Sequence, residues 1–222
     1  MIRAISRPFL VTGGSGVLGR VLLPLLVAQG HDVRAPAHDE LDLFDAARVG
    51  DAVGDTEAIF HLATRIPSRE RNRDPEAWRE NDRLREEASR LLVDAALAST
   101  TELYVQPSVT FIYPAEGPVD EQTPIGEVQP HLESSLAAER QAARFAGAGR
   151  RGVVLRFGLL DGPGTGQETP DPRAGATLHV EDAGRALLAA LAAPSSVYNV
   201  VRDGERVSNA RFKQATGWHP RL

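Results

Sequence analysis

The sequence predicts an α/β protein built on a doubly wound parallel sheet. Short apolar segments alternate with segments in which apolar residues recur at helical spacing, and this alternation is typical of parallel β-α-β units. The first strand and the first helix are separated by a glycine-rich turn, 13–19. The chain has 222 residues, of which 42% are hydrophobic, so it can bury one sizeable core. We therefore expect a single domain over residues 1–222.

Composition and charge exclude several classes of protein. The formal net charge is −5, and the Lys and Arg residues are scattered among acids, so a nucleic-acid partner is not expected. The chain has no cysteine, which excludes disulfides and thiolate chemistry. The apolar stretch 17–28 is broken by Arg20 and Pro24 and is too short to span a bilayer. We expect a cytoplasmic protein with no membrane partner.

The N-terminal third reads as three strands and one helix. An apolar strand is expected at 8–12, and the helix starts at Val17 and stops before Gly30. A second strand, with a weaker sequence signal, is expected at 31–36, and a third strand at 58–63.

The middle of the chain reads as two long helices between strands. A helix over 75–98 opens at Asp74-Pro75, since Asp suits an N-cap and Pro the first turn. A strand at 102–105 leads into a loop rich in Pro and Gly, 107–130. Such a long loop is typical of a functional segment. A helix at 132–146 and a strand at 151–157 follow.

The last third begins with a turn-rich stretch, 158–175, which is either an ordered cofactor-side loop or a mobile one. Its glycines and prolines favour mobility. Next come a strand at 178–180, a helix at 181–192, a strand at 197–201 and a helix near 209–216.

The glycine turn is the strongest functional signal. Gly13 permits a tight turn, Gly16 lets the backbone approach a pyrophosphate, and Gly19 lets the helix pack on the strand. The phosphates would lie at the helix N-terminus, where free N–H groups and the dipole favour negative charge. The turn therefore predicts a Rossmann-like fold that binds a nicotinamide dinucleotide.

The end of the second strand bears on the choice between NAD and NADP. The acid that usually binds the ribose 2′-hydroxyl of NAD is missing at the end of the second strand. Asp39 and Glu40 lie slightly beyond the usual position of that acid. Arg34 and His38 could meet the 2′-phosphate of NADP, so NADP is weakly favoured over NAD. The alternative is that both side chains are ordinary solvated residues.

Further segments extend the pattern, in order, along nearly the whole chain. They are Glu40-Leu-Asp-Leu-Phe-Asp45, Phe60-His-Leu-Ala-Thr64, Leu91-Leu-Val-Asp-Ala-Ala96, Leu155-Arg-Phe-Gly-Leu-Leu-Asp-Gly-Pro163, His179-Val-Glu-Asp182 and Gly217-Trp-His-Pro220. With the glycine turn, the chain resembles an extended short-chain dehydrogenase/reductase of the NAD-dependent epimerase/dehydratase family. The resemblance implies a shortened member with a reduced C-terminal substrate lobe, contributed by 158–222.

The resemblance and the glycine turn together predict the cofactor site. Its expected members are Gly13, Gly14, Ser15, Gly16, Val17, Leu18, Gly19, Arg34, His38, Asp42, Leu43, Leu62, Ala63, Thr64, Asn81, Phe157, Gly158 and Leu159. No metal ligands are expected, because the histidines show no ligand spacing.

The expected active site departs from the family. The family uses a Tyr-x-x-x-Lys pair, and the alignment puts His131 at the Tyr position and Ser135 at the Lys position. His131 could serve as acid and base, because imidazole titrates near neutrality, or it could simply flank the helix. The remaining catalytic candidates are Ser108, Thr110 and Tyr113, and for Tyr113 a packing role is favoured.

Three functions remain open. The first is an NAD(P)-dependent oxidoreductase or epimerase/dehydratase-like enzyme acting on a small carbonyl or hydroxyl compound. The second is a non-redox isomerase, lyase or cyclase, and the third is a catalytically inactive nucleotide-binding regulator. The helices at 75–98 and 132–146 resemble those that pair in the family's dimers, so a homodimer is possible.

Overall fold

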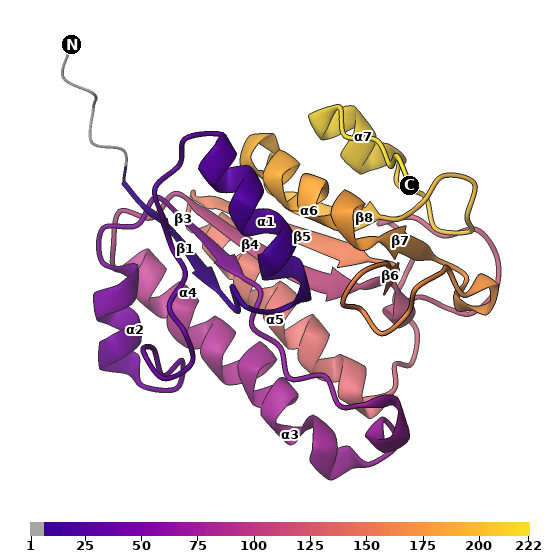
Figure 1. Cartoon of the computed structure of the whole chain (residues 1–222), viewed down its shortest axis with the longest axis horizontal. Coiled ribbons are helices and arrows are strands. Elements are labelled where there is room, and N and C mark those ends of the chain that lie inside the picture. Colours follow the sequence, from indigo (N-terminus) through magenta and orange to yellow (C-terminus); the bar gives the residue numbers. More distant parts are fainter. Residues whose placement is uncertain (1–6) are drawn as a thin grey trace.

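A six-stranded parallel sheet forms the centre of the molecule (Figure 1). The computed structural model describes residues 7–222, with the backbone alone described for Arg69. The strand order is β2-β1-β3-β4-β5-β8, and every neighbouring pair is parallel. The order reverses at β1, so the crevice between the carboxyl ends of β1 and β3 is the place where such sheets bind ligands. The predicted doubly wound α/β class is confirmed.

Most elements occur where the alternation predicts them. The strands are β1 (Phe9–Thr12), β2 (Val33–Arg34), β3 (Ala58–His61), β4 (Leu103–Val109), β5 (Arg151–Phe157), β6 (Leu159–Asp161), β7 (Thr177–His179) and β8 (Ser196–Val200). The helices are α1 (Val17–Ala28), α2 (Ala46–Val53), α3 (Pro75–Arg83), α4 (Ser89–Leu97), α5 (Pro130–Gly147), α6 (Val180–Ala189) and α7 (Ala210–Thr216).

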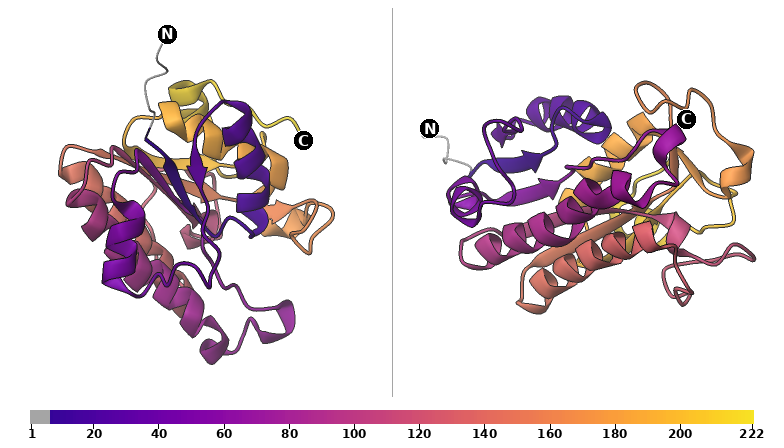
Figure 2. Two further views of the ribbon diagram at one scale, coloured as in Figure 1. Left: turned by 60° about the vertical axis from the view of Figure 1, so that its left-hand side comes forward. Right: turned by 90° about the horizontal axis from the view of Figure 1, so that it is seen from below.

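Helices cover both faces of the sheet, and this explains why the strands are apolar at successive positions (Figures 1 and 2). Val11, Phe60 and Val105 belong to the core cluster under α1 and α6. Ile59 and Tyr104 alternate with them and belong to the cluster under α2, α4 and α5. The sheet is therefore buried on both sides, and polar chemistry is concentrated at its carboxyl edge.

Helix α2, the end of β4 and the long helix after β3 differ from the sequence prediction. Helix α2 was not predicted; Asp45 caps it by accepting hydrogen bonds from the N–H groups of Ala47 and Arg48. Strand β4 runs on to Val109, so the loop expected from residue 107 starts later. The expected helix over 75–98 contains a π-helical segment, Leu84–Ala88, between α3 and α4.

The C-terminal part adds a second, two-stranded parallel sheet made of β6 and β7. Part of the turn-rich stretch expected at 158–175 is thus a strand. A single parallel β-bridge joins Val119 to Val207, and it brings the loop after β4 against the loop after β8. Within residues 7–222, no helix is both long and apolar enough to cross a membrane.

Candidate functional site

The glycine turn has the geometry of a phosphate cradle. A Cβ on Gly13, whose φ is +71°, would lie 2.6 Å from the Ala63 backbone, and one on Gly19 would lie 2.4 Å from the Gly14 oxygen. Both positions therefore require glycine. Gly16 is the exposed N-cap of α1 and has no side-chain cap, so the first N–H groups of the helix face outward for an anion.

His61, the last residue of β3, makes hydrogen bonds to β1 and to the π-helical segment between α3 and α4. Its Nδ1 lies 2.7 Å from the Thr12 hydroxyl and its Nε2 lies 3.0 Å from the Leu84 carbonyl oxygen. The π-helical segment begins at Leu84, and such segments leave backbone groups outside the usual ladder. Burial lowers the pKa of His61 to about 4, so the ring is neutral, accepting from Thr12 and donating to Leu84. His61 thus has a structural role.

The buried, neutral His61 predicts a pH dependence of stability. Between pH 6.5 and about 4, the unfolded chain binds a proton at His61 that the folded chain does not bind. The free energy of unfolding should therefore fall as the pH falls through this window, with a slope of about 1.4 kcal/mol per pH unit from this residue. His61→Gln keeps a donor and an acceptor but does not titrate. Urea unfolding should show a shallower pH dependence for this variant; parallel curves for the two proteins would contradict the prediction.

A cavity of about 320 Å³ lies beside the glycine turn, between the end of β2 and α2. Its lining residues are Leu10, Arg34, Ala35, Pro36, Glu40 and Ala52. A Cβ on Gly14 would lie 3.0 Å from the Ala35 Cβ, so the cavity adjoins the turn. Arg34 makes an ion pair with Asp55 at 3.0 Å, but both side chains are exposed, so the pair is weak. His38 is exposed and lies outside this lining.

The other predicted cofactor residues fall into two groups. Leu62, Ala63 and Thr64 directly follow β3, and Phe157, Gly158 and Leu159 follow one another at the end of β5 and the start of β6. Asp42 is exposed and accepts a hydrogen bond from the Phe44 N–H, and Leu43 packs against the core under α2. The residues that follow β3 and β5 therefore lie at the carboxyl edge of the sheet. Asp42 and Leu43 form the second group and lie in the segment before α2.

Three buried polar atoms in this region lack a hydrogen-bond partner among the described residues: Asn81 Nδ2, Thr110 Oγ1 and Ser135 Oγ. They belong to α3, to the turn after β4 and to the first half of α5. Asn81 also holds the loop after β3, because its Oδ1 accepts from the Arg65 N–H at 3.0 Å. Buried polar groups are almost always paired, so unpaired ones point to a missing ligand. Together with the glycine cradle, they fit a dinucleotide.

His131 lies in the first turn of α5, one turn before Ser135. Its ring stacks on Trp78 with centroids 4.5 Å apart. Burial and the positive charge of Arg85 lower the pKa of His131 below its ordinary value, while Asp82 opposes them. His131 is therefore mainly neutral at pH 7.

Ser108 and Tyr113, two of the catalytic candidates, are held in a buried polar network. The Ser108 hydroxyl donates to Glu139 Oε1 at 2.5 Å, and Arg156 donates to both Glu139 oxygens at 2.9 and 2.6 Å. Arg156 also donates to the Tyr113 oxygen at 2.7 Å, and Tyr113 donates to Asn199 at 2.8 Å. Both hydroxyl protons are thus engaged within the protein.

Burial and the network together shift the pKa values of Tyr113 and Arg156. Burial raises the pKa of Tyr113, although Arg156 opposes the shift. Burial alone would lower the pKa of Arg156, but the hydrogen bonds and charge of Glu139 raise it above the ordinary value. At neutral pH, Tyr113 is a neutral phenol and Arg156 a cation.

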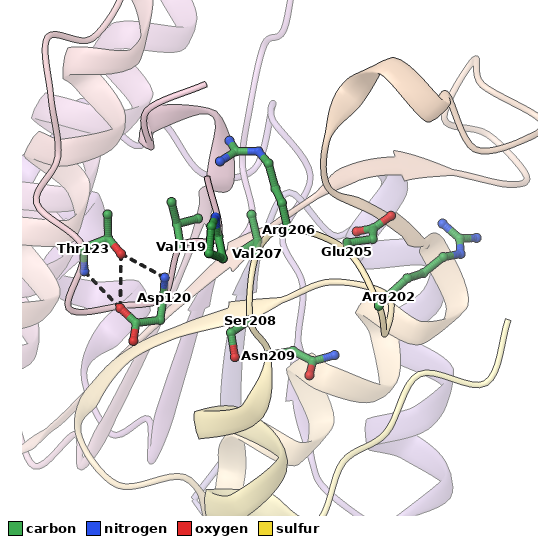
Figure 3. A pocket seen from close by; sticks show the side chains of 11 residues that line it. Val119, Asp120, Thr123, Arg202, Glu205, Arg206, Val207, Ser208 and Asn209 are labelled. Carbon is green, nitrogen blue, oxygen red and sulfur yellow. Dashed lines mark hydrogen bonds between the residues drawn. The ribbon is translucent and has the colours of Figure 1, made fainter. Parts of the chain in front are cut away.

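A second cavity, of about 500 Å³, opens at the same edge of the sheet near β8 (Figure 3). Its walls are segments 118–123 and 202–209, which the Val119–Val207 bridge joins. Sequence reasoning did not predict this cavity: 118–123 lies in the loop 107–130, which was expected to be functional, but 202–209 was only the connection between a strand and the last helix. It also missed the Glu139–Arg156 pair, although an arginine in the apolar strand 153–157 was a usable signal, since arginine is seldom buried without a partner.

The fold and the glycine cradle define a Rossmann-type α/β protein. The sequence profile of the NAD dependent epimerase/dehydratase family matches residues 9–178. The chain therefore belongs to this family, and the resemblance inferred from its motifs is confirmed. The family supports a nicotinamide dinucleotide as the cofactor.

Two curated relatives and one solved structure illustrate the family. A Streptomyces sp. protein named 3-diazoavenalumate denitrifying reductase is 32% identical over 91% of this chain and 78% of its own length. A 2-alkyl-3-oxoalkanoate reductase from Stenotrophomonas maltophilia (strain K279a) is 29% identical over 72% of this chain and 53% of its own length. RMD from Pseudomonas aeruginosa, solved with NADPH, has the same fold, with a TM-score of 0.78 at 22% identity; the alignment covers 98% of this chain and 94% of RMD.

Proposed function

We propose that this protein is an NAD(P)H-dependent reductase. The observation that carries the proposal is the glycine cradle at the N-terminus of α1, where a Cβ fits neither at Gly13 nor at Gly19. Two curated relatives are named as reductases, and this favours a redox function over a non-redox lyase or an inactive regulator. Bound NAD(P)H would supply the hydride.

In this proposal each end of the cofactor meets residues described above. The N–H groups at the start of α1 would hold the pyrophosphate, and the 320 Å³ cavity beside Ala35 would take the adenosine. The unpartnered atoms Asn81 Nδ2 and Ser135 Oγ would hydrogen-bond the hydroxyls of the ribose that carries the nicotinamide. Arg34 and His38 would meet the 2′-phosphate if the cofactor is NADP.

The residues on α5 bear on the kind of acceptor. Reduction of a carbonyl creates an alkoxide, which needs a nearby proton donor. Replacing a diazonium group by hydride needs none, since a C–H bond forms, the C–N bond breaks and N₂ leaves with the electron pair. At His131 and Ser135, helix α5 offers a mostly neutral imidazole and a hydroxyl. This pair suits an acceptor of the diazonium type, and the Streptomyces relative is named for a diazo compound.

A carbonyl acceptor is the second candidate, and the partly buried position of His131 favours it. The imidazole lies in the first turn of α5, close to Arg85 and Asp82. It would donate the proton to the carbonyl oxygen of the substrate, and the Thr110 hydroxyl would donate a hydrogen bond to the same oxygen. Because the imidazolium is the proton donor, carbonyl reduction should slow as the pH rises through the pKa of His131, which burial and the charge of Arg85 hold below its ordinary value.

One experiment separates the two acceptors. NADPH oxidation is followed at 340 nm with an aryl diazonium carboxylate and, separately, with a 3-oxoalkanoate, for the wild type and His131→Phe. Phe keeps the stacking on Trp78 but cannot transfer a proton. We expect diazonium reduction to survive the substitution within about twofold, whereas His131-dependent carbonyl reduction should fall by about 100-fold. If neither NADPH nor NADH binds the wild type, the proposal is wrong.

A further inference from the structure

The 500 Å³ cavity between segments 118–123 and 202–209 is lined by one cation, Arg206, that no acid among the described residues 7–222 neutralises. Of its four charged lining residues, Arg202 donates two hydrogen bonds to Asp161, at 2.6 and 2.8 Å. Glu205 accepts from the N–H and the hydroxyl of Thr177, at 2.6 and 2.5 Å. These two side chains are therefore held by partners within the protein.

The third charged side chain, Asp120, is also satisfied locally. Its Oδ1 accepts hydrogen bonds from the N–H groups of Gln122 and Thr123, at 2.9 and 3.1 Å. It serves to close a turn, and Figure 3 shows these contacts on the side of the cavity away from Glu205.

Arg206 differs from the other three. Within residues 7–222 its guanidinium has no carboxylate within 4 Å, and it makes one long hydrogen bond, of 3.4 Å, to the Gly117 carbonyl oxygen. Its Nε would lie 2.9 Å from a Cβ on Gly175, so the absence of a side chain there leaves room for the guanidinium. Figure 3 shows the side chain directed away from Glu205 and Arg202.

The lining also contains three aliphatic residues. Pro118 is exposed, whereas Val119 and Val207 are 5% and 2% exposed and form a small cluster with Tyr113, Ala176 and Val201. The cavity thus combines an unneutralised guanidinium with an aliphatic surface at Pro118. A guanidinium binds a carboxylate through two parallel hydrogen bonds, and an aliphatic surface favours an apolar ligand body.

We propose that this cavity binds a small carboxylate with an apolar aryl or alkyl body, and that Arg206 holds the carboxylate. The ligand body contacts Pro118 and the exposed edges of Val119 and Val207. Gly175, which leaves room for Arg206, precedes Ala176, whose carbonyl oxygen accepts from the N–H of Leu159 at 2.9 Å; Leu159 is one of the expected cofactor residues. Both curated relatives are named for carboxylates, an avenalumate and an oxoalkanoate.

The assignment of this carboxylate as the reduced substrate rests on the proposed reductase function; carboxylate binding itself does not. The test is isothermal titration calorimetry with cinnamate, an arylalkenoate, and with cinnamamide, its neutral counterpart. The proteins are the wild type, Arg206→Met and Arg140→Met. Arg140 is exposed on α5 and lies outside the cavity lining, so its variant controls for loss of one positive charge.

We expect the wild type and Arg140→Met to bind cinnamate at least about tenfold more tightly than cinnamamide, and Arg206→Met to lose this preference. The NADPH affinity, measured by fluorescence, should be the same in all three proteins. Cinnamate binding that is absent in the wild type, or unchanged in Arg206→Met, would overturn the proposal. Failure to bind NADPH while the cinnamate preference persists would instead refute the reductase function alone.

Discussion

Glu139→Ala should lower the free energy of unfolding by about 3–5 kcal/mol, because it leaves the Arg156 guanidinium buried without its counter-charge. The side chains of Arg156 and Glu139 are only 6% and 9% exposed, and they make two hydrogen bonds to each other. The substitution also removes the acceptor of the Ser108 hydroxyl. Urea unfolding at pH 7, followed by circular dichroism, measures the change.

Two controls make this result specific. The double variant Glu139→Leu with Arg156→Met removes both charges and keeps the volume, so it should recover most of the lost stability. Glu87→Ala breaks the exposed pair with Arg83 and should change the free energy of unfolding by less than about 1 kcal/mol. A loss below about 1 kcal/mol for Glu139→Ala would mean that the buried ion pair does not stabilise the fold.

Gly16→Val should weaken NADPH binding by about 100-fold, which corresponds to about 2.7 kcal/mol. Gly16 is exposed at the start of α1, and its φ of −73° is accessible to any residue. A Cβ there would meet only the Gly13 oxygen, at 3.1 Å. The added isopropyl group should therefore leave the fold intact and keep the pyrophosphate away from the helix N–H groups, with loss of charge-assisted hydrogen bonds. Fluorescence titration with NADPH measures the affinity.

Gly147→Val is the matched control, since a Cβ at Gly147 meets nothing within 4 Å and this position ends α5, far along the helix from Ser135. It should bind NADPH as the wild type does. Thermal unfolding of both variants checks that the fold is kept. An unchanged NADPH affinity in a folded Gly16→Val protein would exclude the turn as the pyrophosphate site.

The parallel sheet could be predicted because its strands are apolar on both faces and each is bounded by turn residues. Helix α2 could not, since it is short and largely exposed, and its N-cap Asp45 was interpreted only as the last residue of the family-like segment Glu40-Leu-Asp-Leu-Phe-Asp45. The extension of β4 was missed because Pro107 was interpreted as the start of a loop, yet it lies inside the strand. Tertiary pairing with β5 overrides the local signal there.

The site could be predicted where it depends on backbone geometry. Gly13 and Gly19 have fixed steric roles in the turn, so their spacing between a strand and a helix predicts its backbone geometry. The engagement of Ser108 and Tyr113 could not be foreseen, because their partners Glu139 and Asn199 lie 31 and 86 residues away in the sequence. Residues that meet only through the sheet register leave no local pattern.

The β-bridge between Val119 and Val207 has a consequence for any molecule that enters the neighbouring cavity. Two backbone hydrogen bonds hold the walls together, from the Val119 N–H to the Arg206 oxygen at 2.9 Å and from the Ser208 N–H to the Val119 oxygen at 2.8 Å. The conformational entropy of these two loops is thus lost during folding and not at the moment of association. A ligand therefore meets a preorganised surface, and more of its contact energy is retained as affinity.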